Sequence, residues 1–206
     1  MIDFNKEVKN WDQNPMKIER ARVFANEIVK MIPVSKKMNA LEYGAGTGLV
    51  SFNLCEFVKE IILMDNSKGM TEESNKKIRD LKISNMSSVT YDLTNNDKFI
   101  NKFNLIYTLL TLHHILDIKE ILNKLYKLLE DGGYLCIADL ITEDGSFHHK
   151  YPNFTGHNGF GINELIKLLS VAGFKNFKHK VFYSIEKTIN DKIKNYPLFI
   201  LTAQKK

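Results

Sequence analysis

Leu41-Glu42-Tyr43-Gly44-Ala45-Gly46-Thr47-Gly48-Leu49 is the stretch of sequence that decides the fold. Apolar residues at helical spacing follow it from Val50 to Cys55, so the segment predicts a strand, a glycine-rich turn and a helix. Glycine lets the backbone bend tightly and lets a ligand approach the main chain, because no Cβ stands in the way. The helix start adds free N–H groups and the positive end of a dipole. Together these features predict a nucleotide-like ligand at the turn.

The spacing of the glycines excludes two common nucleotide motifs. A dinucleotide fingerprint, G-x-G-x-x-G counted from Gly44, would need its third glycine at Leu49. A P-loop would need Lys and then Ser or Thr after its last glycine, where Leu49 and Val50 stand. Glu-x-Gly-x-Gly-x-Gly remains, and a purely structural glycine-rich turn in another α/β protein is the alternative.

The composition is that of a single globular domain. The chain has 206 residues of which 44% are hydrophobic, enough for one sizeable core and too few for two comfortable domains. A net charge of +5 could indicate nucleic acid or a membrane surface. The lysines are spread along the chain, however, and this favours a solvated Lys-rich surface.

Cysteine usage and the N-terminal residues indicate the compartment. Cys55 and Cys136 lie far apart in apolar surroundings, with no CxxC pair, so we expect two core thiols in a reducing environment. Residues 1–7 lack the apolar core of a signal sequence, and no apolar stretch is long enough to span a bilayer. We therefore expect a cytoplasmic protein with no membrane partner.

Strands and helices alternate along the chain, which predicts a parallel sheet with helices on both faces. Pro15 is expected to open a first helix over 16–31. Beyond the glycine-rich turn, the expected strands are 59–65, 87–93, 103–108 and 134–140, and the expected helices are 66–81 and 117–129, with a turn at 130–133.

The C-terminal part departs from this alternation. After a helix over 162–172, a strand over 174–185 and a strand over 197–203 are separated only by a polar connection over 188–195. Two strands without an intervening helix predict an antiparallel pair at the end of the sheet. Pro197 is expected at the start of the last strand, where its missing N–H is tolerated.

Acidic residues close two of the expected strands. Asp65 lies about 20 residues beyond the glycine-rich turn, where α/β nucleotide-binding units place an acid for ribose hydroxyls. A carboxylate there can accept hydrogen bonds from both hydroxyls of a diol, although a helix-capping role is the alternative. Asp92 closes the next strand and fits a loop equally well.

Residues 141–160 carry three of the six histidines, His148, His149 and His157. A long, aromatic, histidine-bearing loop in a compact domain is usually functional or mobile, so we expect 141–161 to lie on the substrate side of the site. A metal site made of these three histidines is not expected, because adjacent histidines rarely present both rings to one ion.

Several motifs in the correct order resemble the class I S-adenosylmethionine-dependent methyltransferases over nearly the whole chain: the glycine-rich turn, Asp65, Asp92-Leu93, Leu112-His113-His114 and the C-terminal strand pair. The likeness is to small-molecule enzymes of the methyltransferase domain 11 type. It implies a Rossmann-like seven-stranded mixed sheet, mostly parallel with an antiparallel C-terminal hairpin, in one domain over 1–206 with an N-terminal helical cap over 1–32. It also implies S-adenosylmethionine as cofactor, in-line methyl transfer to a small-molecule acceptor, and a monomer or homodimer.

The resemblance also implies roles for single residues. The backbone of Gly44, Ala45 and Gly46 should hold the amino-acid end of the cofactor, with Glu42 orienting the loop. Asp65 should bind the ribose. The other expected cofactor contacts are Asn66, Met70, Asp92 and Leu93 around the adenine and Thr108 near the sulfonium.

On the acceptor side, His113 is the first candidate base, because it follows the strand that borders the methyl donor. His148 and His157 on the loop are the next candidates, and a packing role is the alternative for each. Trp11, Tyr151 and Phe154 are expected to contact the substrate, with Trp11 pinning the N-terminal helix to the core as its alternative.

Three other functions stay open. Enzymes that methylate amino groups of nucleic acids carry an Asn/Asp-Pro-Pro-Tyr/Phe motif where Tyr107-Thr108-Leu109-Leu110 stands, so a nucleic acid partner is not expected. Cofactor binding without catalysis is a second alternative. A nicotinamide-dependent oxidoreductase is disfavoured by the missing third glycine.

Overall fold

The computed structural model describes residues 4–95 and 98–206, without the side chains of Lys6 and Lys9. The strands within these ranges are β1 (Asn39–Tyr43), β2 (Glu60–Asp65), β3 (Met86–Thr90), β4 (Phe103–Leu109), β5 (Leu129–Leu140), β6 (Phe174–Ile189) and β7 (Lys192–Lys205). The helices are α1 (Phe4–Trp11), α2 (Pro15–Met31), α3 (Leu49–Leu54), α4 (Lys68–Asp80), α5 (Ile118–Leu128) and α6 (Ile162–Val171), with short 3₁₀ turns η1 (Leu112–His114) and η2 (Ser146–His148).

The strands form one seven-stranded sheet in the order β3-β2-β1-β4-β5-β7-β6. The pairings are parallel from β3 to β5, and β7 runs antiparallel to both β5 and β6. The predicted mixed, mostly parallel sheet with an antiparallel C-terminal hairpin is therefore confirmed.

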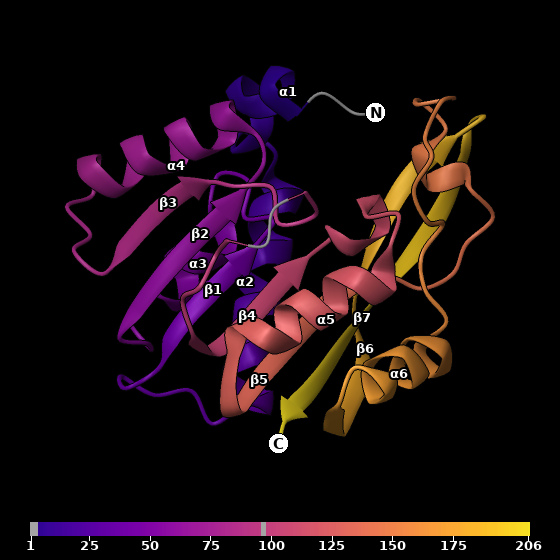
Figure 1. Ribbon diagram of the computed structural model, residues 1–206. Coiled ribbons are helices and arrows are strands. Elements are labelled where there is room, and N and C mark those ends of the chain that lie inside the picture. Colours follow the sequence, from indigo (N-terminus) through magenta and orange to yellow (C-terminus); the bar gives the residue numbers. More distant parts are fainter. Residues whose placement is uncertain (1–3, 96–97) are drawn as a thin grey trace.

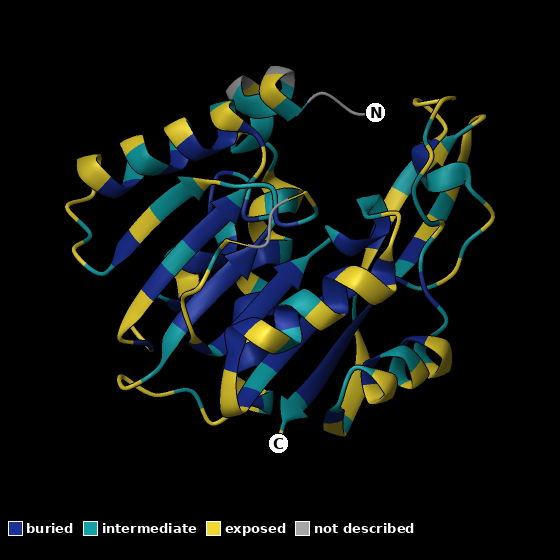
Figure 2. Ribbon diagram, in the orientation of Figure 1, coloured by how far each residue is buried: buried dark blue, intermediate teal, exposed yellow. Residues whose placement is uncertain are grey.

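Helices cover both faces of the sheet (Figure 1). Leu135 and Ile137 of β5 pack in the core that α5 and α6 close, whereas Cys136 and Ala138 pack in the core that α2 and α3 close. Successive side chains of a strand point to opposite faces, so a strand with helices on both sides has to be apolar throughout. The central strands are accordingly buried along most of their length (Figure 2).

Helix α1 was not predicted, because residues 1–15 are mostly polar. Phe4, Val8 and Trp11 recur on one side of it, which is the spacing of an amphipathic helix. Asn5 Oδ1 accepts hydrogen bonds from Ser67 Oγ and from the backbone N of Gly69, both at 2.9 Å. These bonds fasten α1 to the start of α4, at the edge where the parallel strands end.

The hairpin is longer than predicted. The polar connection expected over 188–195 is wrong, because β6 and β7 continue to a two-residue turn at Asn190 and Asp191, whose φ angles are 48° and 61°. Two residues of positive φ make the turn that fits the twist of a β-ribbon, and Asn and Asp tolerate it. Only a small apolar cluster, which includes Ile185 and Tyr196, supports this ribbon, and most of its outer side chains are exposed and polar, so they gave no strand signal.

Two local predictions are also corrected. Pro197 lies inside β7, not at its start, at the level where pairing with β5 ends at Leu198. A missing N–H costs little there, because the ladder with β5 has ended and only the carbonyl of Pro197 is still used, by the backbone N of Ile141 at 3.1 Å. The turn predicted over 130–133 belongs to β5, where pairing with β4 jumps from Leu129 to Tyr134, so these residues bulge out of the ladder.

The carboxyl ends of β1 to β4 meet at one edge of the sheet, where α1, residues 141–160 and the tip of the hairpin also gather (Figure 1). In α/β sheets this edge is where ligands bind. Within the described ranges, none of the helices has the length and apolarity needed to cross a bilayer.

Candidate active site

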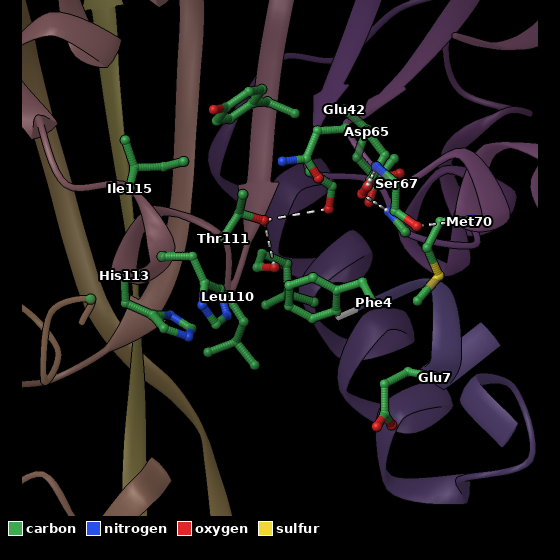
Figure 3. Close-up of a pocket in the computed structure, with 18 of the residues that line it drawn as sticks. Phe4, Glu7, Glu42, Asp65, Ser67, Met70, Leu110, Thr111, His113 and Ile115 are labelled. Carbon is green, nitrogen blue, oxygen red and sulfur yellow. Dashed lines mark hydrogen bonds between the residues drawn. The ribbon is translucent and has the colours of Figure 1, made fainter. Parts of the chain in front are cut away.

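A cavity of about 1260 Å³ opens at this edge of the sheet. We call one side of it the glycine wall, which comes from the ends of β1, β2 and β3 and comprises residues 42–46, 65–67, 70 and 92–95. We call the opposite side the histidine wall, and it comprises residues 20, 109–111, 113, 114, 147, 148, 151, 154 and 183–187. Figure 3 shows Asp65 and Met70 on one side of the cavity and His113 and Ile115 on the other.

The glycine-rich turn is packed directly against the exit of β4. Gly44 has a φ of +70°, and a Cβ there would lie 2.2 Å from Cγ2 of Thr111. Thr111 Oγ1 in turn donates hydrogen bonds to the carbonyl oxygens of Gly44 and Leu109, at 3.4 and 3.2 Å (Figure 3). Only glycine meets both the backbone conformation and the close approach.

Asp65 joins the turn to the exit of β2. Its Oδ2 accepts a hydrogen bond from the backbone N of Gly46 at 2.7 Å, and its Oδ1 accepts one from the backbone N of Ser67 at 2.8 Å. Burial raises the pKa of this carboxyl, and the backbone N–H groups oppose that shift. Each carboxylate oxygen has a second lone pair, so Asp65 keeps acceptor capacity for a ligand.

Glu42 is buried beneath the turn, with an exposed fraction of 3%. Its Oε2 accepts hydrogen bonds from the backbone N of Ser51 at 3.1 Å and from Ser51 Oγ, which also contacts the Tyr107 hydroxyl at 2.6 Å. Burial raises the pKa of Glu42 to about 8. The carboxyl group therefore fastens β1 to α3 and holds the turn in place from below.

The outer end of the glycine wall is polar on one side and aromatic on the other. Burial would raise the pKa of Asp92, but hydrogen bonds from Thr94 and Asn95 outweigh it and lower that pKa. Trp11 stands over the turn, with its Nε1 3.7 Å from where a Cβ on Gly46 would be. Lys17 Nζ lies 3.3 Å from the centre of the Trp11 ring.

The histidine wall is built around a buried pair. His113 Nδ1 lies 2.6 Å from Oδ1 of Asp139, and the His113 backbone N donates to Oδ2 of the same carboxylate at 3.2 Å. Asp139 has no exposed surface and also accepts from the backbone N of Leu140 at 2.8 Å. This arrangement fixes the imidazole of His113 through Nδ1 and leaves Nε2 for chemistry.

Two further histidines converge on His113. Ring centres are 4.1 Å apart for His113 and His114, 5.2 Å for His113 and His148, and 5.7 Å for His114 and His148. One ring nitrogen from each lies within 4.8 Å of the other two, so this trio could hold a metal ion. Burial lowers the pKa of His114 to about 3 and that of His148 to about 4, which keeps both rings neutral. His148 also stacks on Phe154, with ring centres 3.6 Å apart.

Two cations line the same side of the cavity. Burial lowers the pKa of Arg20 to about 10, and burial together with Arg20 lowers the pKa of Lys187 to about 8. Lys187 Nζ donates to the Phe147 carbonyl at 2.7 Å, whereas Arg20 Nε is buried without a hydrogen-bond partner among the described residues. Neither side chain forms an ion pair within 4–95 and 98–206. Lys187 Nζ lies 3.4 Å from the centre of the Phe147 ring, and the charge of Glu143 acts on it from a greater distance.

The cavity brings together most of the residues that the sequence singled out. Those lining it are Glu42, Gly44, Ala45, Gly46, Asp65, Asn66, Met70, Asp92, Leu93, His113, His148, Trp11, Tyr151 and Phe154. Thr108 does not line it, because β4 runs on to Leu109 and leaves Thr108 fully buried. His157 does not line it either, since its Nε2 is 2.9 Å from the Ile115 carbonyl and its backbone N donates to the His113 carbonyl at 2.7 Å.

The residues of the histidine wall that sequence reasoning missed include His114, Thr111, Arg20 and Lys187. His114 was within reach of it, because it follows His113 in the Leu-His-His segment. Thr111, Arg20 and Lys187 carry no local signal and become site residues only when β4, α2 and β6 meet. The histidine trio that was weighed as a metal site does not form, because His149 is exposed and His157 bonds to Ile115.

A family model described as "Methyltransferase domain" matches residues 34–187. An uncharacterized methyltransferase of Schizosaccharomyces pombe is 31% identical over 153 residues, which is 68% of this chain and 54% of that protein. The chain thus spans about half the length, 54%, of the curated relative that it matches.

Solved structures share the fold. Phosphoethanolamine N-methyltransferase 2 from Haemonchus contortus, in complex with S-adenosyl-L-methionine, superposes with a TM-score of 0.74 at 12% identity, covering 100% of this chain and 60% of that one. The N-methyltransferase NodS from Bradyrhizobium japonicum, in complex with S-adenosyl-L-homocysteine, superposes with a TM-score of 0.70 at 15% identity, covering 99% of both chains.

Proposed function

Because the chain belongs to the class I S-adenosylmethionine-dependent methyltransferase family, we propose that it transfers a methyl group from S-adenosylmethionine to a small-molecule acceptor. One observation carries the proposal: a single cavity of about 1260 Å³ joins the glycine wall to the histidine wall. That space exceeds the roughly 300–1,000 Å³ of an ordinary ligand pocket, as a site for two small molecules requires. The small-molecule methyltransferases among the solved structures support the choice of acceptor.

The glycine wall fits the cofactor. The space in front of Gly46 is bounded by Trp11 and Met70, whose nearest atoms are 3.7 and 4.0 Å from where a Cβ would be, so a side chain there would take up ligand space. We assign the amino-acid end to the backbone of 44–46 above Glu42, and the ribose to Asp65. The adenine would lie among Asn66, Met70, Asp92 and Leu93. When bound, S-adenosylmethionine supplies an electrophilic methyl group on a positively charged sulfur.

The assignment of Thr108 to the border of the sulfonium has to be changed. Its side chain is buried away from the cavity, whereas Leu109 and Leu110, the next two residues, line it. We assign the border near the sulfonium to these two residues and to Thr111.

The histidine wall would activate the acceptor. Asp139 accepts from Nδ1 of His113, so the unprotonated Nε2 is the atom left to contact the reacting group. His148 lines the cavity beside it and is the second candidate for that contact. His157 is assigned a positioning role, since it holds the backbone of η1. Phe154, Tyr151 and Trp11 supply apolar surface that excludes water from the reaction.

The acceptor is further proposed to carry an anionic group. Arg20 and Lys187 present two positive charges to the cavity without a carboxylate partner among the described residues. A buried cation is costly unless it is paired, and a carboxylate or phosphate on the acceptor would pair it. Residues 1–32 would then act as a cap and 141–161 as the acceptor-side loop of a single domain.

The proposal is tested by measuring S-adenosylhomocysteine release with pools of small acidic metabolites, together with calorimetry of S-adenosylmethionine binding. Release and binding should both be lost in Asp65→Ala and retained in Asp80→Ala, an exposed acid at the end of α4. Binding without release from any pool would leave only a cofactor-binding protein. Equal binding by the two variants would overturn the assignment of the glycine wall.

A further inference from the structure

We propose that His113, His114 and His148 bind one divalent transition-metal ion, with zinc the first candidate, at the acceptor end of the cavity. The three side chains come from η1 and η2, which are more than 30 residues apart in sequence and meet only in the fold. Binding of the ion stands on this geometry alone. Its role in catalysis rests on the proposed function, in which the ion would replace Nε2 of His113 as the group that activates the acceptor.

The ring nitrogens are close to the separation that an ion needs. One nitrogen of each ring lies within 4.8 Å of the others. Ligands at 2.0–2.1 Å around a tetrahedral zinc ion are about 3.4 Å apart, so closing the site takes shifts of about 1 Å. Within the described chain, no hydrogen bond holds the rings of His114 or His148 in place, so side-chain rotation can supply these shifts.

The surroundings of His113 are those of a metal ligand. A ligating histidine usually donates its second ring N–H to a carboxylate, which fixes the tautomer and makes the other nitrogen more basic. His113 Nδ1 meets Asp139 at 2.6 Å, and backbone N–H groups of His113 and Leu140 hold the carboxylate in place. The imidazole is therefore held through Nδ1, and its Nε2 is the nitrogen left to ligate an ion.

His148 supplies a second, independent observation. Only 5% of this residue is exposed, and its Nδ1 is buried without a hydrogen-bond partner among the described residues. A buried polar atom without a partner destabilises the fold, so native proteins seldom leave one unexplained. An ion among the three rings is a partner that accounts for it.

Aromatic packing is the competing explanation for the cluster. His148 stacks on Phe154 at 3.6 Å between ring centres, and His114 meets Phe4 edge to face at 5.3 Å. Packing accounts for the rings lying together, but it gives no reason for the buried nitrogen of His148 or for the carboxylate behind His113. The nearby ammonium of Lys187 opposes cation binding, and the charge of Asp139 offsets it.

Three protein ligands would leave the fourth position of a tetrahedral ion open, and an acceptor could fill it because all three histidines line the cavity. An acceptor with a thiol, hydroxyl or other protic group would bind there through the deprotonated atom. A bond forms between that atom and the ion, and the proton leaves to solvent. The bound ion lowers the pKa of the coordinated group, which provides a nucleophile at neutral pH. The acceptor class is thus an anionic small molecule with a protic, metal-binding nucleophile.

The test uses untagged protein, stripped with a chelator and titrated with Co²⁺, which reports tetrahedral coordination by its visible absorption bands. We expect one ion per chain and competition by Zn²⁺. His148→Ala and His114→Ala should each weaken Co²⁺ binding by about 100-fold, and Asp139→Asn by about 10–100-fold, as loss of an outer-shell partner does. His149→Ala, which removes the exposed neighbour, is the matched control and should bind as the wild type does.

Absence of tetrahedral bands in correctly folded protein, or equal affinity in His148→Ala and His149→Ala, would overturn the inference. Circular dichroism confirms that each variant is folded, and calorimetry of S-adenosylmethionine on the same samples separates the two proposals. Cofactor binding without Co²⁺ binding rejects only the metal site. Co²⁺ binding without cofactor binding rejects the proposed function and leaves the metal site standing.

Discussion

The two walls of the cavity are built in opposite ways. The glycine wall comes from one continuous part of the chain, residues 42–95, and backbone N–H groups satisfy the carboxylate of Asp65. The histidine wall draws on residues from Arg20 to Lys187, and two of its polar atoms, Arg20 Nε and His148 Nδ1, are buried without partners among the described residues. In the first wall the carboxylate of Asp65 is paired before any ligand arrives, although the hydroxyl of Tyr91 at the end of β3 is also buried without a partner among the described residues. In the second wall the groups without partners are nitrogens that a ligand can reach.

The largest expected effect comes from breaking the glycine wall at its tightest contact. Gly44→Ala would place a Cβ 2.2 Å from Thr111 at a φ of +70°, so we expect calorimetry to detect no S-adenosylmethionine binding. Gly132→Ala is the control, because it has a similar φ of +77° and no atom within 4 Å. It should cost about 1 kcal/mol of stability from backbone strain and leave the affinity unchanged. If both variants bind S-adenosylmethionine equally well, close packing of the glycine-rich turn against Thr111 is not needed for cofactor binding.

A second prediction concerns the carboxyl group beneath that wall. Glu42 has a pKa of about 8 in the folded protein, above the ordinary 4.5, so between these values the folded state holds a proton that the unfolded state has lost. Stability should therefore fall as pH rises from 4.5 to 8 and level off above it, by at most about 4–5 kcal/mol. Glu42→Gln should not show this fall. Urea denaturation of both proteins from pH 5 to 9 measures the difference, and parallel curves would contradict it.

A third prediction turns to the histidine wall. Arg20→Gln removes the unpaired guanidinium, so the KM for the acceptor should rise about tenfold or more, as loss of a charge-assisted hydrogen bond does. Affinity for S-adenosylmethionine should stay the same, because Arg20 is not part of the glycine wall. Arg22 lies on the same helix, is exposed and pairs with Glu19. Arg22→Gln should therefore change neither the KM for the acceptor nor the affinity for S-adenosylmethionine. A fall in cofactor affinity for Arg20→Gln alone would mean that the two walls are not independent.

The smallest effect is expected where the walls meet. Trp11 stands over Gly46 and stacks with Lys17, and it is the single tryptophan of the chain. Trp11→Ala should weaken S-adenosylmethionine binding by about two- to fivefold, the scale of one cation–π or aromatic contact. In the wild type, quenching of its fluorescence should report cofactor binding directly. No quenching on binding would show that Trp11 does not cover the cofactor.

The contrast between the walls also explains what the sequence could predict. Gly44, Asp65 and Asp92 sit at the ends of successive strands, and a parallel sheet brings such ends to one edge whatever the rest of the chain does. Their place in the cavity was therefore predictable from local patterns. Thr108 was misplaced because a shift of one residue along a strand moves a side chain to the other face.

The histidine wall was predicted less completely for the opposite reason. His113 and His148 were found by residue type, but their meeting with His114 depends on how η1 and η2 pack, which no local pattern encodes. Helix α1 was missed because its apolar face is short and lies within a polar segment. The outer part of the hairpin was missed because its side chains are mostly polar and backbone pairing accounts for most of its strand structure. The periodicity of apolar residues gives little signal over such elements.

The hairpin has a consequence for how this protein can change over generations. Pairing of β7 with β5 stops at Leu198, so residues 192–196 pair with β6 alone and form a ribbon that stands clear of the sheet. Residues 183–187, which lie on that ribbon, reach the cavity without any bond to the strands that carry the glycine wall. Under the proposed function, mutations in the ribbon would alter the choice of acceptor and leave the residues assigned to the methyl donor unchanged. A fold divided in this way can serve many acceptors with one donor.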